Sequence, residues 1–313
     1  MKSPFRYSDD NKRYYTYNYY LRQRFGQKVF KVSLDAGFTC PNRDGSKGTG
    51  GCIYCSDKRS GDFAGNPFED IAVQFDKVRA ELHKKWENAV YIPYFQAGTN
   101  TYGDYERLEE LFTRAVSFEN AVGLAVATRA DCIDEKTADL FAELSENKYV
   151  TVELGLQTIH DETARLINRC HSYEDFLKGY EMLKSRGINV CVHLINGLPY
   201  ETREMMLETV REVGKLHPHS IKLHLMHILK GTALERLYYE KPFHVFELSE
   251  YASLICDQLE LIPEDVVIQR ITGDGAKDDL VAPLWSLKKF CVMNEIDKEM
   301  LRRNTVQGAK AEK

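Results

Sequence analysis

Apolar residues along this chain alternate between short β-like runs and longer segments with helical spacing. Six runs rich in β-branched and aromatic residues each predict a strand: 29–35, 89–96, 122–127, 149–156, 189–195 and 220–226. Between the first two, apolar residues recur at three- and four-residue intervals and predict a helix from about Phe68 to Trp86. Six successive βα units indicate a parallel sheet, because each parallel crossover needs a helix to return the chain.

The predicted fold is therefore α/β, a partial (βα)6 TIM-type barrel with amino- and carboxyl-terminal extensions. We expect an amino-terminal extension at 1–28, the barrel at 29–235, and a carboxyl-terminal extension at 236–313 that completes or covers the barrel. Residues 266–274 look like one more strand and a polar loop. A length of 313 residues is ordinary for one barrel domain. Chemistry in such barrels collects at the carboxyl ends of the strands.

Three cysteines, Cys40, Cys52 and Cys55, follow the first predicted strand, in a loop rich in Gly, Asn and Asp. The spacing of the last two is used by both iron–sulfur and zinc sites. A structural zinc needs four ligands, and neither a second Cys pair nor a nearby His supplies the fourth. Three thiolates favour a four-iron cluster with one open iron. A zinc completed by a distant residue, or three merely buried cysteines, are the alternatives.

Five other cysteines are scattered, mostly within apolar runs, and are predicted to lie in the core: Cys132, Cys170, Cys191, Cys256 and Cys291. Eight cysteines without an apolar signal segment indicate a reducing compartment, so we expect a cytoplasmic protein with no membrane partner. The net charge of −5 predicts no general attraction to polyanions. A nucleic-acid partner would have to meet a local basic surface.

The segment 12–24 interleaves basic residues with tyrosines. This composition can stack on RNA bases and contact phosphates. It also fits an amphipathic helix that covers the open end of the barrel, and tyrosines at helical spacing are more often used for packing.

Four features together resemble the radical S-adenosylmethionine (radical SAM) enzymes. They are the cysteine triplet, the aromatic residue before the last cysteine, the glycine-containing turn after the second strand, and Gly-Leu-Pro after the fifth strand. The resemblance covers about residues 29–235. Within the superfamily, segments 32–45 and 127–131 look like the Elp3-like branch and its small YhcC/YtqA group. Unlike Elp3 itself, this chain is expected to have no length left for an acetyltransferase domain.

The resemblance implies a [4Fe-4S] cluster held by Cys40, Cys52 and Cys55, with S-adenosylmethionine bound at the open iron. It implies reductive cleavage of this cofactor to a 5′-deoxyadenosyl radical, with electrons from a reductase such as flavodoxin or ferredoxin. Members of the group are associated with trimming the carbon-5 side chain of a wobble uridine, so a tRNA substrate is expected. Oxidation or rearrangement of a small metabolite or tetrapyrrole is an alternative. A non-enzymatic alternative is an RNA-binding protein with a structural cluster.

The resemblance also implies cofactor-binding residues. Tyr54 would pack near the adenine, although simple packing of the loop is nearly as good an explanation. Gly98 and Thr99 would present backbone groups to the methionine end. Gln157 and Arg169 resemble the pair that contacts ribose and the methionine carboxylate in radical SAM coproporphyrinogen dehydrogenase. By itself, Arg169 reads as a surface residue on a helix.

The chain departs from these relatives at two positions. Ala127 stands where an acidic residue ends the third strand, and His193 stands where coproporphyrinogen dehydrogenase has Asp. Ribose contacts are therefore open, with Arg129, Asp131 or backbone groups as substitutes. His193 is either a cofactor contact or a satisfied interior histidine.

Strand alternation places further polar side chains toward the barrel interior. Glu153 and Gln157 share one face of the fourth strand, and Lys222 and His224 share one face of the sixth. Buried polar groups need partners, so Lys222 and His224 are candidates for catalytic, cofactor or substrate contacts. A structural pair between Lys222 and Glu153 is equally compatible. Finally, Gln269, Arg270 and Asp274 are candidates for the substrate mouth.

Overall fold

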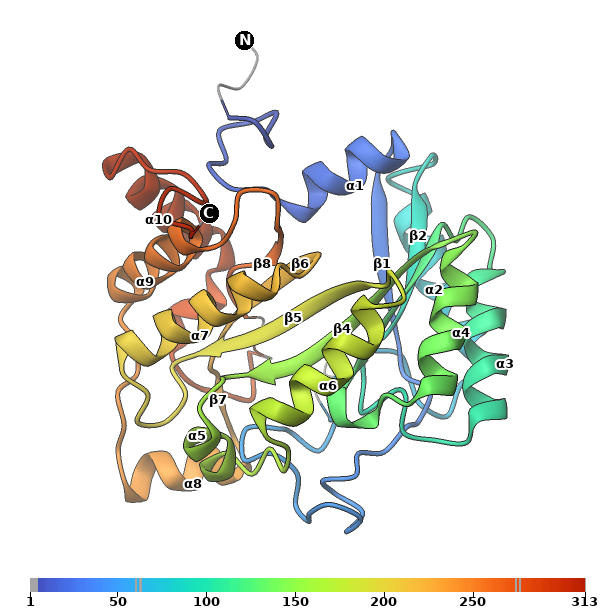
Figure 1. Cartoon of the computed structure of the whole chain (residues 1–313), viewed down its shortest axis with the longest axis horizontal. Helices are drawn as coiled ribbons and strands as arrows, with labels where there is room; N and C mark the ends of the chain where they lie inside the picture. The colour runs from blue at the N-terminus through green and yellow to red at the C-terminus, as the bar shows by residue number, and fades with distance from the viewer. Residues whose placement is uncertain (1–4, 60, 62–63, 274, 276, 313) are drawn as a thin grey trace.

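A computed structural model describes the chain except for residues 1–4, 60, 62–63, 274, 276 and 313. Its centre is a sheet of seven parallel strands in the order β1-β2-β3-β4-β5-β6-β8 (Figure 1). The strands are β1 (Val29–Leu34), β2 (Val90–Phe95), β3 (Gly123–Thr128), β4 (Tyr149–Gln157), β5 (Asn189–Asn196), β6 (Ser220–Leu225) and β8 (Val267–Arg270). β1 and β8 form the two edges, so the sheet is a partial barrel, as the sequence predicts.

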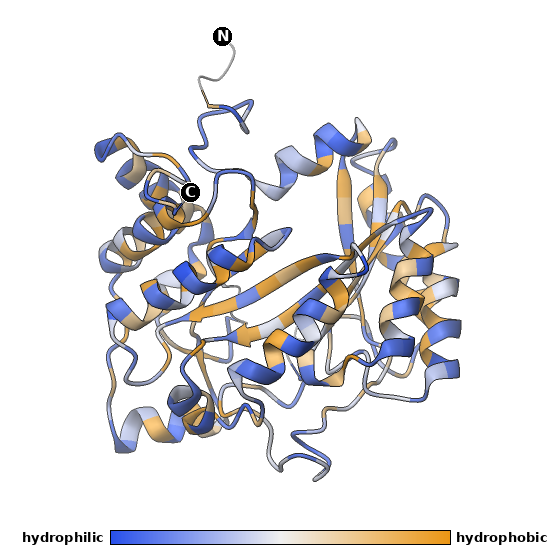
Figure 2. Ribbon diagram, viewed as in Figure 1, coloured by the Kyte–Doolittle hydropathy of each residue, from blue (hydrophilic) through white to orange (hydrophobic). Residues whose placement is uncertain are grey.

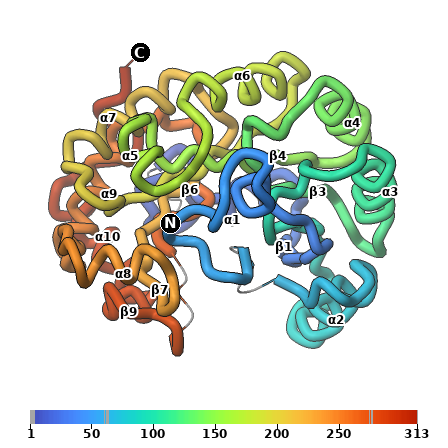
Figure 3. The backbone as a smooth tube through the Cα atoms, turned by 90° about the horizontal axis from the view of Figure 1, so that it is seen from below, coloured from blue at the N-terminus to red at the C-terminus, as the bar shows by residue number. Residues whose placement is uncertain are grey.

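Helices surround the convex side of this sheet in an arc (Figure 3). Those that follow the first five strands are α2 (Ile71–His83), α3 (Tyr105–Val116), α4 (Glu135–Ser145), α6 (Tyr173–Lys184) and α7 (Arg203–Leu216). The remaining elements are α1 (Tyr17–Phe25), η1 (Ala130–Cys132), α5 (Asp161–Leu166), β7 (Ile228–Leu229), α8 (Ala233–Glu240), α9 (Leu248–Leu261), β9 (Leu280–Ala282), η2 (Leu284–Leu287) and α10 (Lys289–Arg302). None of the helices in these ranges has both the length and the apolar character needed to cross a membrane.

Each of the six predicted strands is present, with ends shifted by at most one residue. The predicted helix from Phe68 to Trp86 was too long. It begins at Ile71, because the Asp70 carboxylate accepts a hydrogen bond from the Ala72 N–H at 2.8 Å and caps the helix there. Phe68 lies before this cap and is 96% exposed.

The strands are apolar because both of their faces are largely covered (Figure 2). One face packs against the outer helices, as where Phe95 of β2 meets Phe112 of α3 at a ring-centroid distance of 5.1 Å. The other face lines the barrel interior, where polar side chains such as Lys31 and Glu153 replace apolar ones toward the carboxyl ends. The sequence change along one face therefore marks the transition from core to site.

α1 closes the amino-terminal end of the barrel. Leu21 packs with Val29, Val90 and Tyr149, which stand at the starts of β1, β2 and β4, and Thr16 bridges to Ile268 of β8. The packing interpretation of segment 12–24 is therefore confirmed. The segment lies at the end of the barrel opposite the cysteine loop (Figure 1).

The carboxyl-terminal segment extends the sheet and covers its flank. β8 pairs with β6, so the sheet continues beyond residue 235, and α9 packs against α7 and α10.

The five scattered cysteines outside the cysteine loop differ in burial. Cys191 and Cys256 are buried as predicted, Cys132 and Cys170 are partly exposed, and the core prediction is wrong for Cys291. Cys291 is exposed because α10 turns its other face, with Val292, inward.

Candidate cofactor and substrate site

A cavity of about 590 Å³ extends from the carboxyl ends of the strands into the barrel interior. This size is typical of small-molecule and cofactor sites, roughly 300–1,000 Å³. Eleven of the predicted site residues line it: Cys40, Cys52, Tyr54, Cys55, Gly98, Thr99, Gln157, Arg169, His193, Lys222 and His224. Gln269 and Arg270 also line the cavity, whereas Asp274 lies outside the described residues. The structure thus brings together residues of β4, β5, β6 and β8, of the turn after β2, of the segment after α5, and of the cysteine loop.

The cysteine loop, residues 40–55, is fixed by the segment after α5. Asn168 donates from Nδ2 to the carbonyl oxygens of Thr49 at 3.1 Å and Gly51 at 2.7 Å. In return, Asn42 donates to the Asn168 carbonyl. Within the loop, the Cys55 N–H donates to the Cys52 carbonyl at 3.0 Å and forms the tight turn expected between these cysteines. The loop is therefore positioned by contacts more than a hundred residues away in sequence.

Cys52 sits in surroundings that favour its thiolate. A hydrogen bond with Cys55 contributes most to lowering the pKa of Cys52 to about 6, and the Tyr54 hydroxyl, the Arg129 charge and Asn42 act in the same direction against burial. The thiolate is the form that binds iron. Tyr54 thus contacts the cysteine side of the cavity, and its proposed contact with adenine stays a prediction.

The three loop sulfurs do not all lie within 4.8 Å of one another. Among the described residues, the only three potential ligand atoms from His, Cys, Asp and Glu that all lie within 4.8 Å of one another belong to Glu153, Cys191 and His193. Sulfurs bound about 2.3 Å from a single zinc would be closer together than this limit. The loop cysteines therefore fit a larger, multi-iron cluster better than the zinc alternative.

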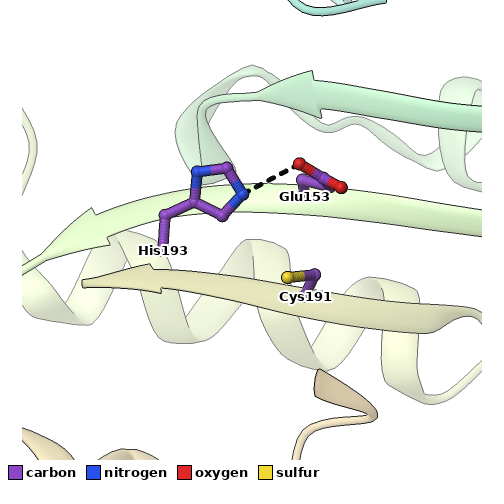
Figure 4. Close-up of side chains that lie close together, drawn as sticks. All are labelled: Glu153, Cys191 and His193. Atoms are coloured by element: carbon purple, nitrogen blue, oxygen red, sulfur yellow. Dashed lines mark hydrogen bonds and ion pairs between the residues drawn. The ribbon is translucent and has the colours of Figure 1, made fainter. Parts of the chain in front are cut away.

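The Glu153, Cys191 and His193 group is not suited to a cation (Figure 4). The carboxylate of Glu153 already faces two ammonium groups, those of Lys31 and Lys222. Burial also raises the pKa of the Cys191 thiol to about 12, which keeps it protonated. A further positive charge would be repelled, so this group is a polar network of the barrel floor.

Glu153 is the centre of that network. Its carboxylate is fully buried and accepts hydrogen bonds from Tyr94 Oη at 2.7 Å and Lys222 Nζ at 2.5 Å, with His193 Nε2 at 2.9 Å and Lys31 also in contact. The predicted alternative of a Lys222–Glu153 pair is confirmed. Burial lowers the pKa of Lys222 to about 8 and that of His193 to about 4.

Two residues of this network, Lys31 and Tyr94, were not among the predicted site residues. Lys31 alternates with Ser33 on β1, and both face the cavity, while Val32 and Leu34 face the helices. Period-two spacing of Lys31 and Ser33 was the available signal. Tyr94 gave no comparable signal, because every residue of β2 is buried and mostly apolar.

The Gly98–Thr99 turn is pressed against the start of the cysteine loop. Gly98 has φ +79°, and a Cβ there would lie 2.5 Å from the Phe38 carbonyl oxygen. The N–H groups of Gly98 and Thr99 donate to the carbonyls of Arg59 and Thr39, each at 3.0 Å. Contacts from the main chain of this turn to a ligand must therefore come from carbonyl oxygens, which suit an amino group.

Arg169 is 1% exposed and follows α5, so the interpretation as a surface helix residue is wrong. Its guanidinium donates to the carbonyl oxygens of Leu156, Thr158 at 2.6 Å, and His171 at 3.0 and 2.9 Å. These bonds use four of its five N–H groups and tie the end of β4 to the following loop. Nearby Gln157 occupies a bulge with φ +65°. Their contacts with cofactor stay predictions.

Three polar residues lie beside the loop, between β3 and α6. Arg129 pairs with both carboxylate oxygens of Asp131 at 2.9 Å, and Asp131 also binds Lys47 of the cysteine loop at 2.5 Å. His171, which was not among the predicted site residues, lines the cavity and is 8% exposed. Its Nδ1 lies 3.9 Å from Asp131 Oδ1, and neither ring nitrogen has a hydrogen-bond partner among the described residues, so this imidazole retains capacity for a ligand.

Comparisons with known proteins agree with this geometry. The family model "Radical SAM superfamily" matches residues 43–213, and "Radical_SAM C-terminal domain" matches residues 218–302. The chain is 47% identical to YtqA of Bacillus subtilis over 98% of this chain and 96% of that protein. It is 37% identical to YhcC of Escherichia coli over 92% of each.

More distant relatives match this chain as well. A tRNA uridine(34) acetyltransferase of Methanocaldococcus infernus is 30% identical over 49% of this chain and 29% of that protein. The solved structure of M. infernus Elp3 with an amino-terminal deletion superposes with a TM-score of 0.65 and 20% identity, covering 90% of this chain and 64% of that one. This last likeness shows the fold.

The cysteine loop, the seven-stranded partial barrel and the extended sequence similarity have one explanation. The chain belongs to the radical SAM superfamily, a family that implies a [4Fe-4S] cluster and S-adenosylmethionine as cofactors.

Proposed function

We propose that this protein reductively cleaves S-adenosylmethionine and uses the resulting radical to modify the carbon-5 side chain of a wobble uridine in tRNA. The observation that carries the proposal is the placement of Cys40, Cys52 and Cys55 on one cavity with a charged floor. Cluster ligands at the mouth and polar side chains below provide separate places for cofactor and substrate.

Residues at different depths in the cavity have different proposed roles. Cys40, Cys52 and Cys55 would hold the cluster, which when bound supplies one electron to the cofactor's sulfonium group. Carbonyl groups of the Gly98–Thr99 turn would accept hydrogen bonds from the cofactor's amino group. Below them, Lys222, His224 and the Glu153 network line the space where a substrate group would be oriented away from bulk water.

The tRNA part of the proposal is supported by partial similarity to a tRNA uridine(34) acetyltransferase. A polymer substrate would have to place one base in the cavity, as enzymes that act on bases do. α1 closes the opposite end of the barrel, where its Tyr17 lines the cavity, so the RNA would approach from the cysteine-loop side. A flavodoxin- or ferredoxin-like reductase is the proposed electron donor.

Two measurements test the proposal. Anaerobically reconstituted protein with dithionite and S-adenosylmethionine should form 5′-deoxyadenosine, and Cys52→Ser should form none. Cys291→Ser is the matched control, because Cys291 is exposed and does not line the cavity. Full cluster occupancy without 5′-deoxyadenosine would contradict the enzymatic proposal and favour a structural cluster.

The substrate is tested by mass spectrometry of tRNA nucleosides from cells that lack the gene. We expect a changed side chain on the wobble uridine, restored by the wild-type gene and not by Cys52→Ser. An unchanged nucleoside profile would exclude this substrate. Turnover of a free metabolite by nuclease-treated enzyme would then identify a small-molecule substrate.

A further inference from the structure

Asn42 contacts a cluster ligand directly. It is fully buried two residues after Cys40, and its Nδ2 lies 3.6 Å from Cys52 Sγ in a hydrogen bond. The same amide nitrogen donates to the Asn168 carbonyl. A reversed amide would place Oδ1 against two acceptors, so these contacts determine the orientation of the side chain.

The surroundings hold Asn42 in this position. The Gly51 N–H donates to the Asn42 carbonyl at 2.8 Å, and a Cβ at Gly48 would collide with Asn42 Oδ1. Asn42 Oδ1 itself has no hydrogen-bond partner among the described residues. A buried amide that leaves its oxygen unpaired while using both N–H groups is arranged for donation.

We propose that Asn42 is a positioning residue that sets the reduction potential of the cluster through its N–H···S hydrogen bond to Cys52. Hydrogen bonds to ligand sulfurs are one of the factors that set the potentials of iron–sulfur clusters. A donor stabilises the additional negative charge of the reduced cluster, so Asn42 raises the potential. The inference depends on ligation by Cys52 and not on the identity of the substrate.

A purely mechanical role is the competing explanation, because Asn42 also joins the loop to Asn168. Asn168→Gly is the matched control. It removes the two side-chain bonds from Asn168 to Thr49 and Gly51, which hold the same loop, but no donor to sulfur. Glycine also tolerates the φ of +55° at this position and keeps the carbonyl that Asn42 uses.

The experiment is a redox titration of the reconstituted full chain without S-adenosylmethionine, followed by electron paramagnetic resonance of the reduced cluster. We expect a more negative midpoint potential for Asn42→Ala than for wild type, and an unchanged potential for Asn168→Gly. Equal potentials for Asn42→Ala and wild type would overturn the proposal. So would an equal shift in both variants. Iron and sulfide content per chain confirms that each sample carries a complete cluster.

If Asn42→Ala does not retain a cluster, the wild-type protein supplies the decisive measurement. Asparagine labelled with ¹⁵N only in the side-chain amide should give a ¹⁵N coupling to the reduced cluster in pulsed electron paramagnetic resonance, and Asn168→Gly should retain it. Absence of this coupling would overturn the proposal. Neither readout involves tRNA or 5′-deoxyadenosine, so failure of the proposed function would be seen separately.

Discussion

The two ends of the cavity are built differently. At the mouth, a loop is held by single contacts from distant segments, such as the amide bonds of Asn168 and the close approach of Gly98 to Phe38. At the floor, side chains from β1, β2, β5 and β6 converge on Glu153 of β4. Sheet register positions the floor, whereas side-chain-to-backbone bonds position the mouth.

This difference predicts two kinds of failure. The floor combines a buried carboxylate with two lysines, and its disruption should reduce the stability of the whole barrel. Within the cysteine loop, only Ile53 and Tyr54 pack against an apolar cluster, so disruption of the mouth should reduce cluster binding more than folding. Substitutions at the two ends should therefore separate these properties.

The largest effect on stability is expected for Glu153→Gln. Neutralising this buried carboxylate leaves Lys31 and Lys222 without their counter-charge and should lower the free energy of unfolding by about 3–5 kcal/mol. Urea denaturation of the cluster-free chain measures the loss. Glu119→Gln is the control, because Glu119 pairs with Arg79 at the surface and should have little effect. Similar midpoints for the two variants would show that the floor does not depend on charge balance.

A smaller change in stability is expected when the pH is varied, because His193 at the floor titrates differently in the folded and unfolded chain. Burial lowers the pKa of His193 from 6.5 to about 4, so the unfolded chain binds a proton below pH 6.5 that the folded chain rejects until about pH 4. This difference makes stability fall as the pH decreases, by about 2 kcal/mol between pH 6.5 and 5. His193→Gln should lose that part of the slope in urea titrations at several pH values. Exposed His244→Gln should keep it, and equal slopes for wild type and His193→Gln would contradict the prediction.

The smallest stability effect is expected at the mouth. Gly98→Ala combines a positive φ with a clash against Phe38 and should cost about 1–2 kcal/mol. Iron content after reconstitution should fall more clearly, because the turn supports the start of the cysteine loop. Gly214→Ala in α7 meets no atom closer than 3.5 Å and should leave iron content unchanged. Normal iron content in Gly98→Ala would mean that the turn does not support the cluster loop.

The pattern of apolar and polar residues predicted the structure correctly where a single periodicity determined it. It predicted the strands, the lumen-facing pair of Glu153 and Gln157, and the common cavity of the predicted site residues. It failed where a local contact competes with the pattern, as at Asp70, whose cap starts α2 after Phe68. It also could not predict the partners of Arg169, because these are backbone carbonyl groups, which have no sequence signature.

The sequence by itself predicted the ligand set, because three cysteines in one loop after the first strand favour a four-iron cluster with one open iron. It also determined the parallel sheet, because alternating strand and helix patterns permit few other connections. Only the tertiary structure determined which polar groups form hydrogen bonds with one another. Hydrogen bonds between Asn42 and Cys52, or between four donors and Glu153, join residues 10 to 122 positions apart. Such pairings depend on distance and direction in space, which the order of residues does not specify.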